Sequence, residues 1–107
     1  MSDIALPKAV ADFVAATNAH DTDGLLAVFA DGAVVSDDGH TLTTATEIRS
    51  WIGSHLIDPQ VVLSPTSYEN NRLVASAVAT SIAAPMNFAF DLAITGDLVT
   101  DLSIDLA

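Results

Sequence analysis

Residues 44–63, TATEIRSWIGSHLIDPQVVL, contain the change of pattern that decides the fold class. Thr44, followed three residues later by Glu47, matches the capping box that starts many helices. Apolar residues then keep a helical spacing until Pro59, which predicts a helix that ends before this proline. From Gln60 onward apolar residues alternate, which is typical of strands. The sequence therefore predicts an α+β fold in which the helices come first.

Two further helices are predicted before this stretch. Pro7 suits the first turn of a helix, and apolar residues at helical spacing follow it until about Ala19. Asp21 is placed to cap a second helix, because its side chain accepts hydrogen bonds from the free amides of a first turn. Gly32 is expected to end that helix.

A short hairpin is predicted between the second and third helices. Residues 33–37 have the pattern of a strand, Asp38-Gly39 that of a tight turn, and Thr41-Leu42 that of a short return strand. Asp37 is therefore expected at the end of a strand, directly before the turn.

Four long strands are predicted after Gln60, separated by three turn signals: Asn70-Asn71, Ala84-Pro85 and Thr95-Gly96-Asp97. Short connections between sequential strands predict an antiparallel meander. Pro65 lies inside the first of these strands, which indicates an edge strand or a bulge because proline cannot donate to a ladder. The second strand, residues 72–83, is apolar or small on both faces, so we expect helices on one side of the sheet and another subunit on the other.

The length of 107 residues predicts one domain over residues 1–107. Hydrophobic residues make up 50% of the chain, so the composition of a disordered protein is absent. No run approaches the roughly 18 to 20 apolar residues of a membrane helix. The start, Met-Ser-Asp-Ile, lacks the pattern of a secretory signal, and there is no cysteine for disulfides or thiolate catalysis. We therefore expect a cytoplasmic protein.

The charge balance restricts the partners. The chain has three Lys and Arg residues and fourteen Asp and Glu residues, which gives a net charge of −11. Nucleic acids and anionic membranes need clusters of Lys and Arg, so neither is an expected partner. The excess of acidic residues is expected to form a solvated surface that favours solubility.

Three segments carry a family resemblance: Phe13 to Asp21 (FVAATNAHD), Leu25 to Val35 with Phe29-Ala30-Asp31, and Glu47 to Trp51 (EIRSW). With the order of elements, they resemble the nuclear transport factor 2-like superfamily, which includes ketosteroid isomerases and SnoaL-like polyketide cyclases. The resemblance implies a cone-shaped fold with three N-terminal helices packed on a curved, mainly antiparallel sheet. It also implies a pocket for a small apolar molecule and a homodimer formed through the sheet face.

The same resemblance implies a catalytic role for Asp37. In ketosteroid isomerase-like proteins a carboxylate at this position removes a proton next to a carbonyl. The positions that supply the enolate-stabilising tyrosine and acid in those isomerases correspond to Phe13 and Phe90, which carry no donor. Asp91 is expected on the opposite face of its strand. The resemblance thus favours an isomerase- or cyclase-like activity on an apolar carbonyl compound, with a non-catalytic ligand-binding or dimeric scaffold module as the alternative.

Asp37 and His40 are the candidate catalytic residues. An apolar pocket disfavours the charged form of a carboxyl group, which would make Asp37 a stronger base. An aspartate before Asp-Gly also suits a hairpin turn through local hydrogen bonds, which is the structural alternative. His40 follows the turn and can reach Asp37 across the hairpin as an acid–base partner, or it is an exposed loop histidine.

The residues predicted to line the pocket are large or aromatic and lie on apolar faces: Phe13, Trp51, His55, Tyr68, Met86, Phe88 and Phe90. Trp51 and Tyr68 each have a polar tip that can donate a hydrogen bond to a bound carbonyl. His55 can contact the ligand or serve as an electrophile. Packing in the core is the alternative for each of them.

No metal or other cofactor is predicted. His20, His40 and His55 match no recognised ligand spacing and fall in three different elements. The chain also lacks a glycine-rich phosphate loop and a nucleophile elbow.

Overall fold

The computed structural model describes residues 5–37 and 39–107, so the predicted turn residue Asp38 lies outside the described residues. The three helices are α1 (Lys8–Asn18), α2 (Thr22–Val28) and α3 (Ala45–Trp51). A π-helical segment, η1 (Ile52–Ile57), continues α3. All three predicted helices are confirmed, and none in the described residues is long and apolar enough to cross a membrane.

Within residues 5–37 and 39–107, six strands form one sheet: β1 (Phe29–Asp37), β2 (His40–Leu42), β3 (Val62–Glu69), β4 (Arg72–Val78), β5 (Met86–Thr95) and β6 (Leu98–Leu106). Their order is β2-β1-β6-β5-β4-β3. The predicted antiparallel meander of β3 to β6 is confirmed. β1 also pairs in parallel with β6, with Val35 opposite Leu102, a pairing that the sequence pattern did not predict.

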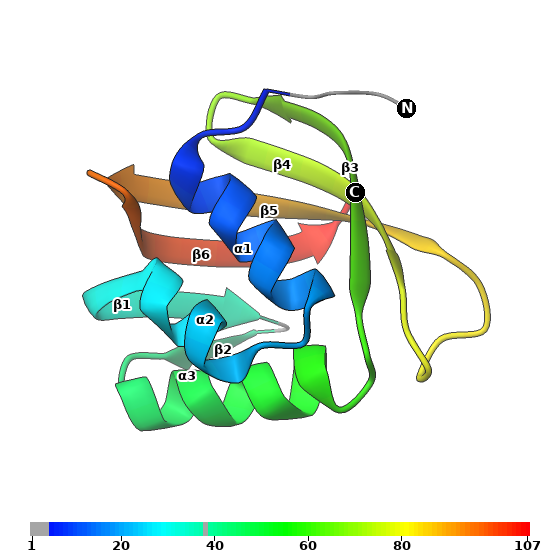
Figure 1. Cartoon of the computed structure of the whole chain (residues 1–107), viewed down its shortest axis with the longest axis horizontal. Coiled ribbons are helices and arrows are strands. Elements are labelled where there is room, and N and C mark those ends of the chain that lie inside the picture. Colours follow the sequence, from blue (N-terminus) through cyan, green and yellow to red (C-terminus); the bar gives the residue numbers. More distant parts are fainter. Residues whose placement is uncertain (1–4, 38) are drawn as a thin grey trace.

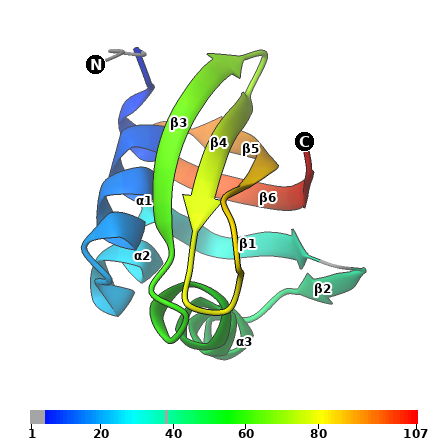
Figure 2. The ribbon, with the colours of Figure 1, turned by 90° about the vertical axis from the view of Figure 1, so that its right-hand side faces the viewer.

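The helices cover one face of the curved sheet, which we call the inner face (Figures 1 and 2). Inner-face residues of β4 such as Leu73 and Ala75 are fully buried, whereas Val78 on the outer face is 45% exposed. Phe13 of α1 packs edge-on against Phe90 of β5, with ring centroids 5.7 Å apart. The core therefore lies between the helices and the inner face.

Local hydrogen bonds explain where α3 begins. The Thr44 hydroxyl accepts from the backbone N–H of Glu47 at 3.1 Å, and the Glu47 carboxylate accepts from the backbone N–H of Thr44 at 3.2 Å, which confirms the capping box. The pKa of Glu47 is lowered because hydrogen bonds stabilise its carboxylate. The largest effect comes from the backbone N–H of Thr43 and the second largest from the Thr44 hydroxyl.

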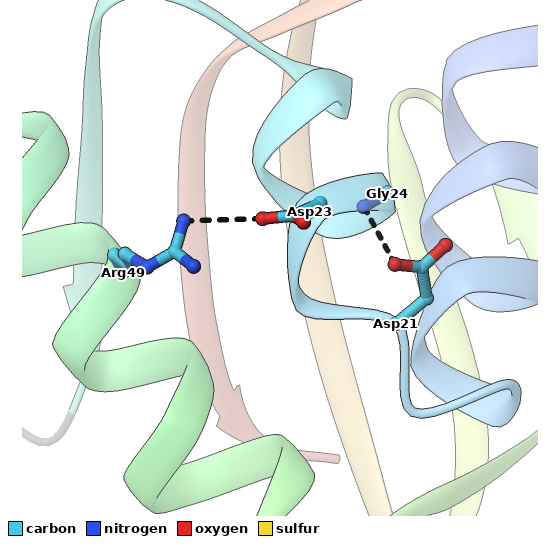
Figure 3. A network of polar contacts seen from close by, with 4 residues as sticks. All are labelled: Asp21, Asp23, Gly24 and Arg49. Carbon is cyan, nitrogen blue, oxygen red and sulfur yellow. Dashed lines mark hydrogen bonds and ion pairs between the residues drawn. The ribbon is translucent and has the colours of Figure 1, made fainter.

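Figure 3 shows how α2 begins and how it is joined to α3. The Asp21 carboxylate accepts from the backbone N–H of Gly24 at 3.0 Å, which confirms Asp21 as the cap. The Arg49 guanidinium of α3 meets the Asp23 carboxylate of α2 at 3.2 Å. Both side chains of this pair are more than half exposed, so the pair contributes little to stability.

The predicted end of the second helix is wrong. α2 ends at Val28, because Phe29 is already extended and lies opposite Val99 of β6. Gly32 instead lies inside β1 with φ +77°, between Phe29 and Val34, where the register with β6 shifts. Glycine adopts this positive φ without steric strain, which permits the irregularity in the strand.

Two predictions for the long strands have different outcomes. Pro65 lies in β3, one of the two edge strands of the sheet, and the register of β3 with β4 shifts between Pro65 and Ser67. The edge and the bulge are thus both confirmed. β4 ends at Val78, earlier than the predicted Ala83, because the chain leaves the sheet in a loop that leads to β5.

Polar contacts from the end of α1 hold the edge strand β3. The Asn18 amide donates to the carbonyl oxygen of Leu63 at 3.0 Å, and its oxygen accepts from the Leu63 N–H at 2.7 Å. His20 Nε2 lies 3.2 Å from the carbonyl oxygen of Val61. Asn18 therefore occupies part of the free edge and fixes the position of β3 relative to the helices.

Candidate functional site

A cavity of about 710 Å³ opens between the inner face of the sheet and the end of the α3–η1 helix. The sheet contributes Ala77, Phe88, Phe90 and Ile104, and the helix contributes Trp51, His55 and Leu56. Its remaining walls come from the ends of β1 and β6, the start of β3 and the loop after β4, including Ile82. This volume is in the range of sites that bind small molecules.

Small side chains explain why the inner face is hollow here. Ala75 and Ala77 of β4 are almost fully buried, and they lie opposite Phe88 and Met86 of β5. An alanine fills less of the space between sheet and helix than the leucine at position 73 of the same strand. The sequence alternation showed these small residues, but it did not show that Ala77 would line a cavity.

Among the described residues, Asp37 is one of the two aspartates that line this cavity, the other being Asp105. It is the last residue of β1, and it lies two positions after the fully buried Val35, on the same inner face. Its backbone is opposite Ile104 of β6 and His40 of β2. The side chain is half-buried and lines the cavity.

The side chain of Trp51 is bonded to Asp37. The Trp51 indole Nε1–H donates to Asp37 Oδ2 at 2.8 Å, and Trp51 itself is only 5% exposed. The capping box fixes the start of α3, so Ile48 and Trp51, three residues apart, both face the core. Trp51 has one polar hydrogen, and the carboxylate already accepts it. The predicted donation from Trp51 to a bound carbonyl therefore does not fit this arrangement.

His55 lies beside this pair on the π-helical segment. Its ring stacks on the Trp51 ring with centroids 6.3 Å apart and planes at 24°. Its Nδ1 is 2.8 Å from the Ser54 hydroxyl oxygen. π-Helical turns occur often at functional sites, and here the turn carries His55 into the cavity wall.

The structure does not bring His40 into the cavity lining. His40 is exposed on β2, with its backbone opposite Asp37 in the ladder. Among the described residues, no hydrogen bond joins its ring to the Asp37 carboxylate. The acid–base role of His40 stays a prediction, and His55 lies on the cavity wall instead.

Three of the seven residues predicted to line the pocket lie elsewhere. Phe13 is fully buried behind Phe90, in the core under α1. The Tyr68 hydroxyl donates to the Asn71 amide oxygen at 3.3 Å, at the far end of the β3–β4 hairpin. Met86 begins β5 and is half-buried outside the lining. The alternation predicted that Met86, Phe88 and Phe90 share one face, but it did not predict the position of each residue along that face.

The basic side chains of the chain lie outside the cavity. Each forms an ion pair elsewhere: Lys8 with Asp12 at 2.6 Å, Arg49 with Asp23 at 3.2 Å and Arg72 with Asp91 at 2.9 Å. The hydrogen bond to Asp12 raises the pKa of Lys8. Within the described residues, no group of His, Asp and Glu side chains is arranged to hold a metal ion. In the part of the chain that the structure describes, the cavity lining thus combines apolar residues with three serines, His55, Asp37 and Asp105, and contains no Lys or Arg.

Comparisons with known proteins agree with this architecture. Residues 10–97 match the family described as the SnoaL-like domain. No curated protein matches the sequence significantly. A proposed polyketide cyclase of Sinorhizobium meliloti is similar in structure, with a TM-score of 0.82 and 23% identity, over 94% of this chain and 95% of that chain.

Two further solved structures share the fold. The orange carotenoid protein of an Anabaena (Nostoc) species, solved with bound canthaxanthin, superposes with a TM-score of 0.84 and 13% identity, over 99% of this chain and 38% of that chain. A Catenulispora acidiphila protein with a ketosteroid isomerase-like fold, solved with trimethylamine, gives a TM-score of 0.74 and 19% identity, over 96% and 88% of the two chains. At such identities the similarity concerns the fold alone.

Proposed function

Because the chain belongs to the SnoaL-like domain family, we propose that it binds a small apolar carbonyl compound and moves a proton next to the carbonyl group, with Asp37 as the general base. Its fold is that of the nuclear transport factor 2-like superfamily. The observation that carries the proposal is the hydrogen bond from Trp51 to Asp37 at the wall of an otherwise largely apolar cavity.

The geometry supports different roles for the two carboxylate oxygens of Asp37. Trp51 holds Oδ2, which orients the carboxylate and leaves Oδ1 for the substrate. Oδ1 takes a proton from the carbon next to the carbonyl, the C–H electron pair forms an enolate, and the carboxylic acid returns the proton to the same carbon or to a conjugated one. No group is oxidised or reduced in this sequence.

The enolate oxygen requires a hydrogen-bond donor, which Phe13 and Phe90 cannot provide. His55 lies on the cavity wall and is the donor that we assign, through its Nε2–H, because Nδ1 is engaged with the Ser54 hydroxyl. The Ser54 hydroxyl, 2.8 Å from Nδ1, orients the ring. His40, opposite Asp37 in the ladder, remains the second candidate.

Deuterium uptake tests this proposal without knowledge of the natural substrate. Methyl naphthyl ketone and a panel of cyclic enones are incubated in deuterated water, and loss of the proton signal next to the carbonyl is followed by NMR. We expect the wild-type protein to accelerate exchange and Asp37→Asn to remove most of the acceleration, since asparagine keeps the shape but not the base. Asp101→Asn, an exposed aspartate outside the cavity lining, is the control.

Equal exchange rates with the wild type and Asp37→Asn would overturn the role of Asp37. A melting curve for each variant shows whether the fold is retained. The asparagine side chain introduced by Asp37→Asn still has an oxygen that can accept the indole N–H, so we expect the fold to survive.

A second candidate function is binding without reaction. It is favoured by the absence of donors at Phe13 and Phe90 and by the canthaxanthin-bound protein of the same fold. An apolar ligand at one hundred times its Kd would stabilise the protein by about 2.7 kcal/mol and raise its melting temperature. Stabilisation by ketones together with no deuterium uptake would favour this function over the first.

We also propose a homodimer formed through the outer face of the sheet. Val62 and Val78 lie opposite each other on this face and are 37% and 45% exposed. Sedimentation velocity is expected to give a dimer for the wild type and a monomer for Val78→Lys. Leu98→Lys, at a position 40% exposed on β6, is the matched control and should remain dimeric. A monomeric wild type would contradict the proposal.

A further inference from the structure

We propose that the same cavity binds organic cations, namely protonated amines on an apolar body, which pair with Asp37 and compete with the carbonyl compound. The proposal takes the location of its site from the proposed function. The amine is a competing ligand, so the proposal is tested by measuring binding and not turnover.

The first observation is the charge of the cavity. Lys8, Arg49 and Arg72 are the only Lys and Arg residues of the chain, and each is paired with an aspartate outside the cavity. An anionic ligand would therefore face Asp37 without a compensating Lys or Arg. With a net charge of −11, the protein as a whole also attracts cations and repels anions.

The second observation is the incomplete pairing of Asp37. Its Oδ2 accepts the Trp51 indole hydrogen, but among the described residues no group donates to Oδ1. The side chain is half-buried, so part of its hydration is already lost. An ammonium group at Oδ1 would supply a charge-assisted hydrogen bond, which is stronger than a bond from a neutral donor.

The third observation is the aromatic wall. Phe88 and Phe90, with ring centroids 6.5 Å apart, line the cavity together with Trp51. Aromatic faces attract cations through their quadrupole, and they also pack against the apolar body of an amine. A carboxylate ligand would gain only the second of these contacts.

Two other ionisable residues in the described ranges, Asp105 and His55, border the cavity. Asp105 lies between Ile104 and Leu106, so strand alternation directs its side chain toward the outer face. His55 stacks on Trp51 and has Nδ1 next to the Ser54 hydroxyl.

Calorimetric titration with three matched compounds tests the proposal: naphthylmethylamine, naphthalenemethanol and naphthoate, at neutral pH. They share one ring system and differ in charge. We expect the amine to bind on the order of tenfold more tightly than the alcohol, because its donor to Asp37 carries a positive charge, and the carboxylate to bind most weakly.

Two variants separate a local from a general charge effect. Asp37→Asn should remove the advantage of the amine and leave the affinity for the alcohol nearly unchanged. Asp101→Asn removes one negative charge outside the cavity lining and should keep the order of the three ligands. Added salt should weaken the amine more than the alcohol.

Equal binding of amine and alcohol, tightest binding of the carboxylate, or no binding of any of the three would overturn the proposal. So would an amine preference that survives Asp37→Asn. Amine selectivity without deuterium uptake would mean that the proposed function has failed while the cation site stands, whereas uptake without amine selectivity would mean the reverse.

Discussion

The inner face of the sheet has two regions that the chain fills differently. Under α1 it is closed, with Phe13 packed against Phe90 and with Leu92 and Leu102 almost fully buried. Thr17 is the buried polar residue of this closed region, and its hydroxyl donates to the Phe13 carbonyl oxygen at 2.8 Å. Toward the end of α3 the face is open and forms the cavity.

The contrast assigns separate roles to the two regions. Among the described residues, the closed region satisfies the buried Thr17 side chain locally and contributes close packing, which stabilises the fold. The open region combines the small Ala77 with the half-buried Asp37 and contains the cavity, where we propose that the ligand binds. Substitutions in the two regions should therefore affect different measurements.

The largest effect on stability is expected from Phe13 in the closed region, and Phe88 at the open region is the comparison. Phe13→Ala in the closed region should lower the free energy of unfolding by about 3 to 5 kcal/mol, because it leaves a cavity in a packed core. Phe88→Ala at the open region should cost about 1 kcal/mol, because Phe88 is only half-buried, and should weaken ligand binding. Urea denaturation measures both. Equal losses would contradict the division into a closed and an open region.

The next largest effect is expected from Asn18, which joins the end of α1 to Leu63 in the cavity wall. Asn18→Ala removes both hydrogen bonds to Leu63 and should lower the free energy of unfolding by about 1 to 2 kcal/mol. Ligand affinity should also fall, because Leu63 is part of the cavity wall. Asn87→Ala, at an exposed asparagine on β5, is the control. A ligand affinity unchanged by Asn18→Ala would mean that the position of β3 does not depend on this contact.

The capping box should have a smaller effect. Thr44→Ala removes the hydroxyl that caps α3 and should cost about 1 kcal/mol of stability. Thr46→Ala changes an exposed threonine in the first turn of the same helix and should cost nothing. Thermal unfolding of the two variants makes the comparison, and similar melting temperatures would count against the capping box as the start of α3.

The smallest effect is a dependence on pH. Folding lowers the pKa of Glu47 below its ordinary value of 4.5, so its contribution to stability is present above that pH. The contribution is lost as the pH falls through the lower pKa of the folded state. The melting temperatures of the wild type and Glu47→Gln should therefore differ at neutral pH and converge in acid. A constant difference across this range would contradict the assignment.

The sequence predicted the parts of the fold that depend on neighbouring residues. Thr44 with Glu47, and Pro65 at an edge, follow from local hydrogen bonding, and both are confirmed. The bond between Trp51 and Asp37 joins residues 14 positions apart and depends on how α3 lies against β1. No local pattern carries that information, although each residue was singled out separately.

The parallel pairing of β1 with β6 was missed for the same reason. It brings Ile104 opposite Asp37, close to the end of the chain, and no turn signal marks a contact over such a separation. Phe13 was placed on the correct side of its helix, but the helical period does not say whether Phe90 would separate it from the cavity.

The most direct test of the account follows the indole N–H of Trp51, the only tryptophan, in a proton–nitrogen correlation spectrum. Bonded to Asp37 and 5% exposed, this hydrogen should exchange slowly with solvent, and its signal should shift when methyl naphthyl ketone fills the cavity. In the Asp37→Asn variant, the indole hydrogen should exchange with solvent faster. Rapid exchange in the wild type, with a signal unmoved by saturating ketone, would contradict the site.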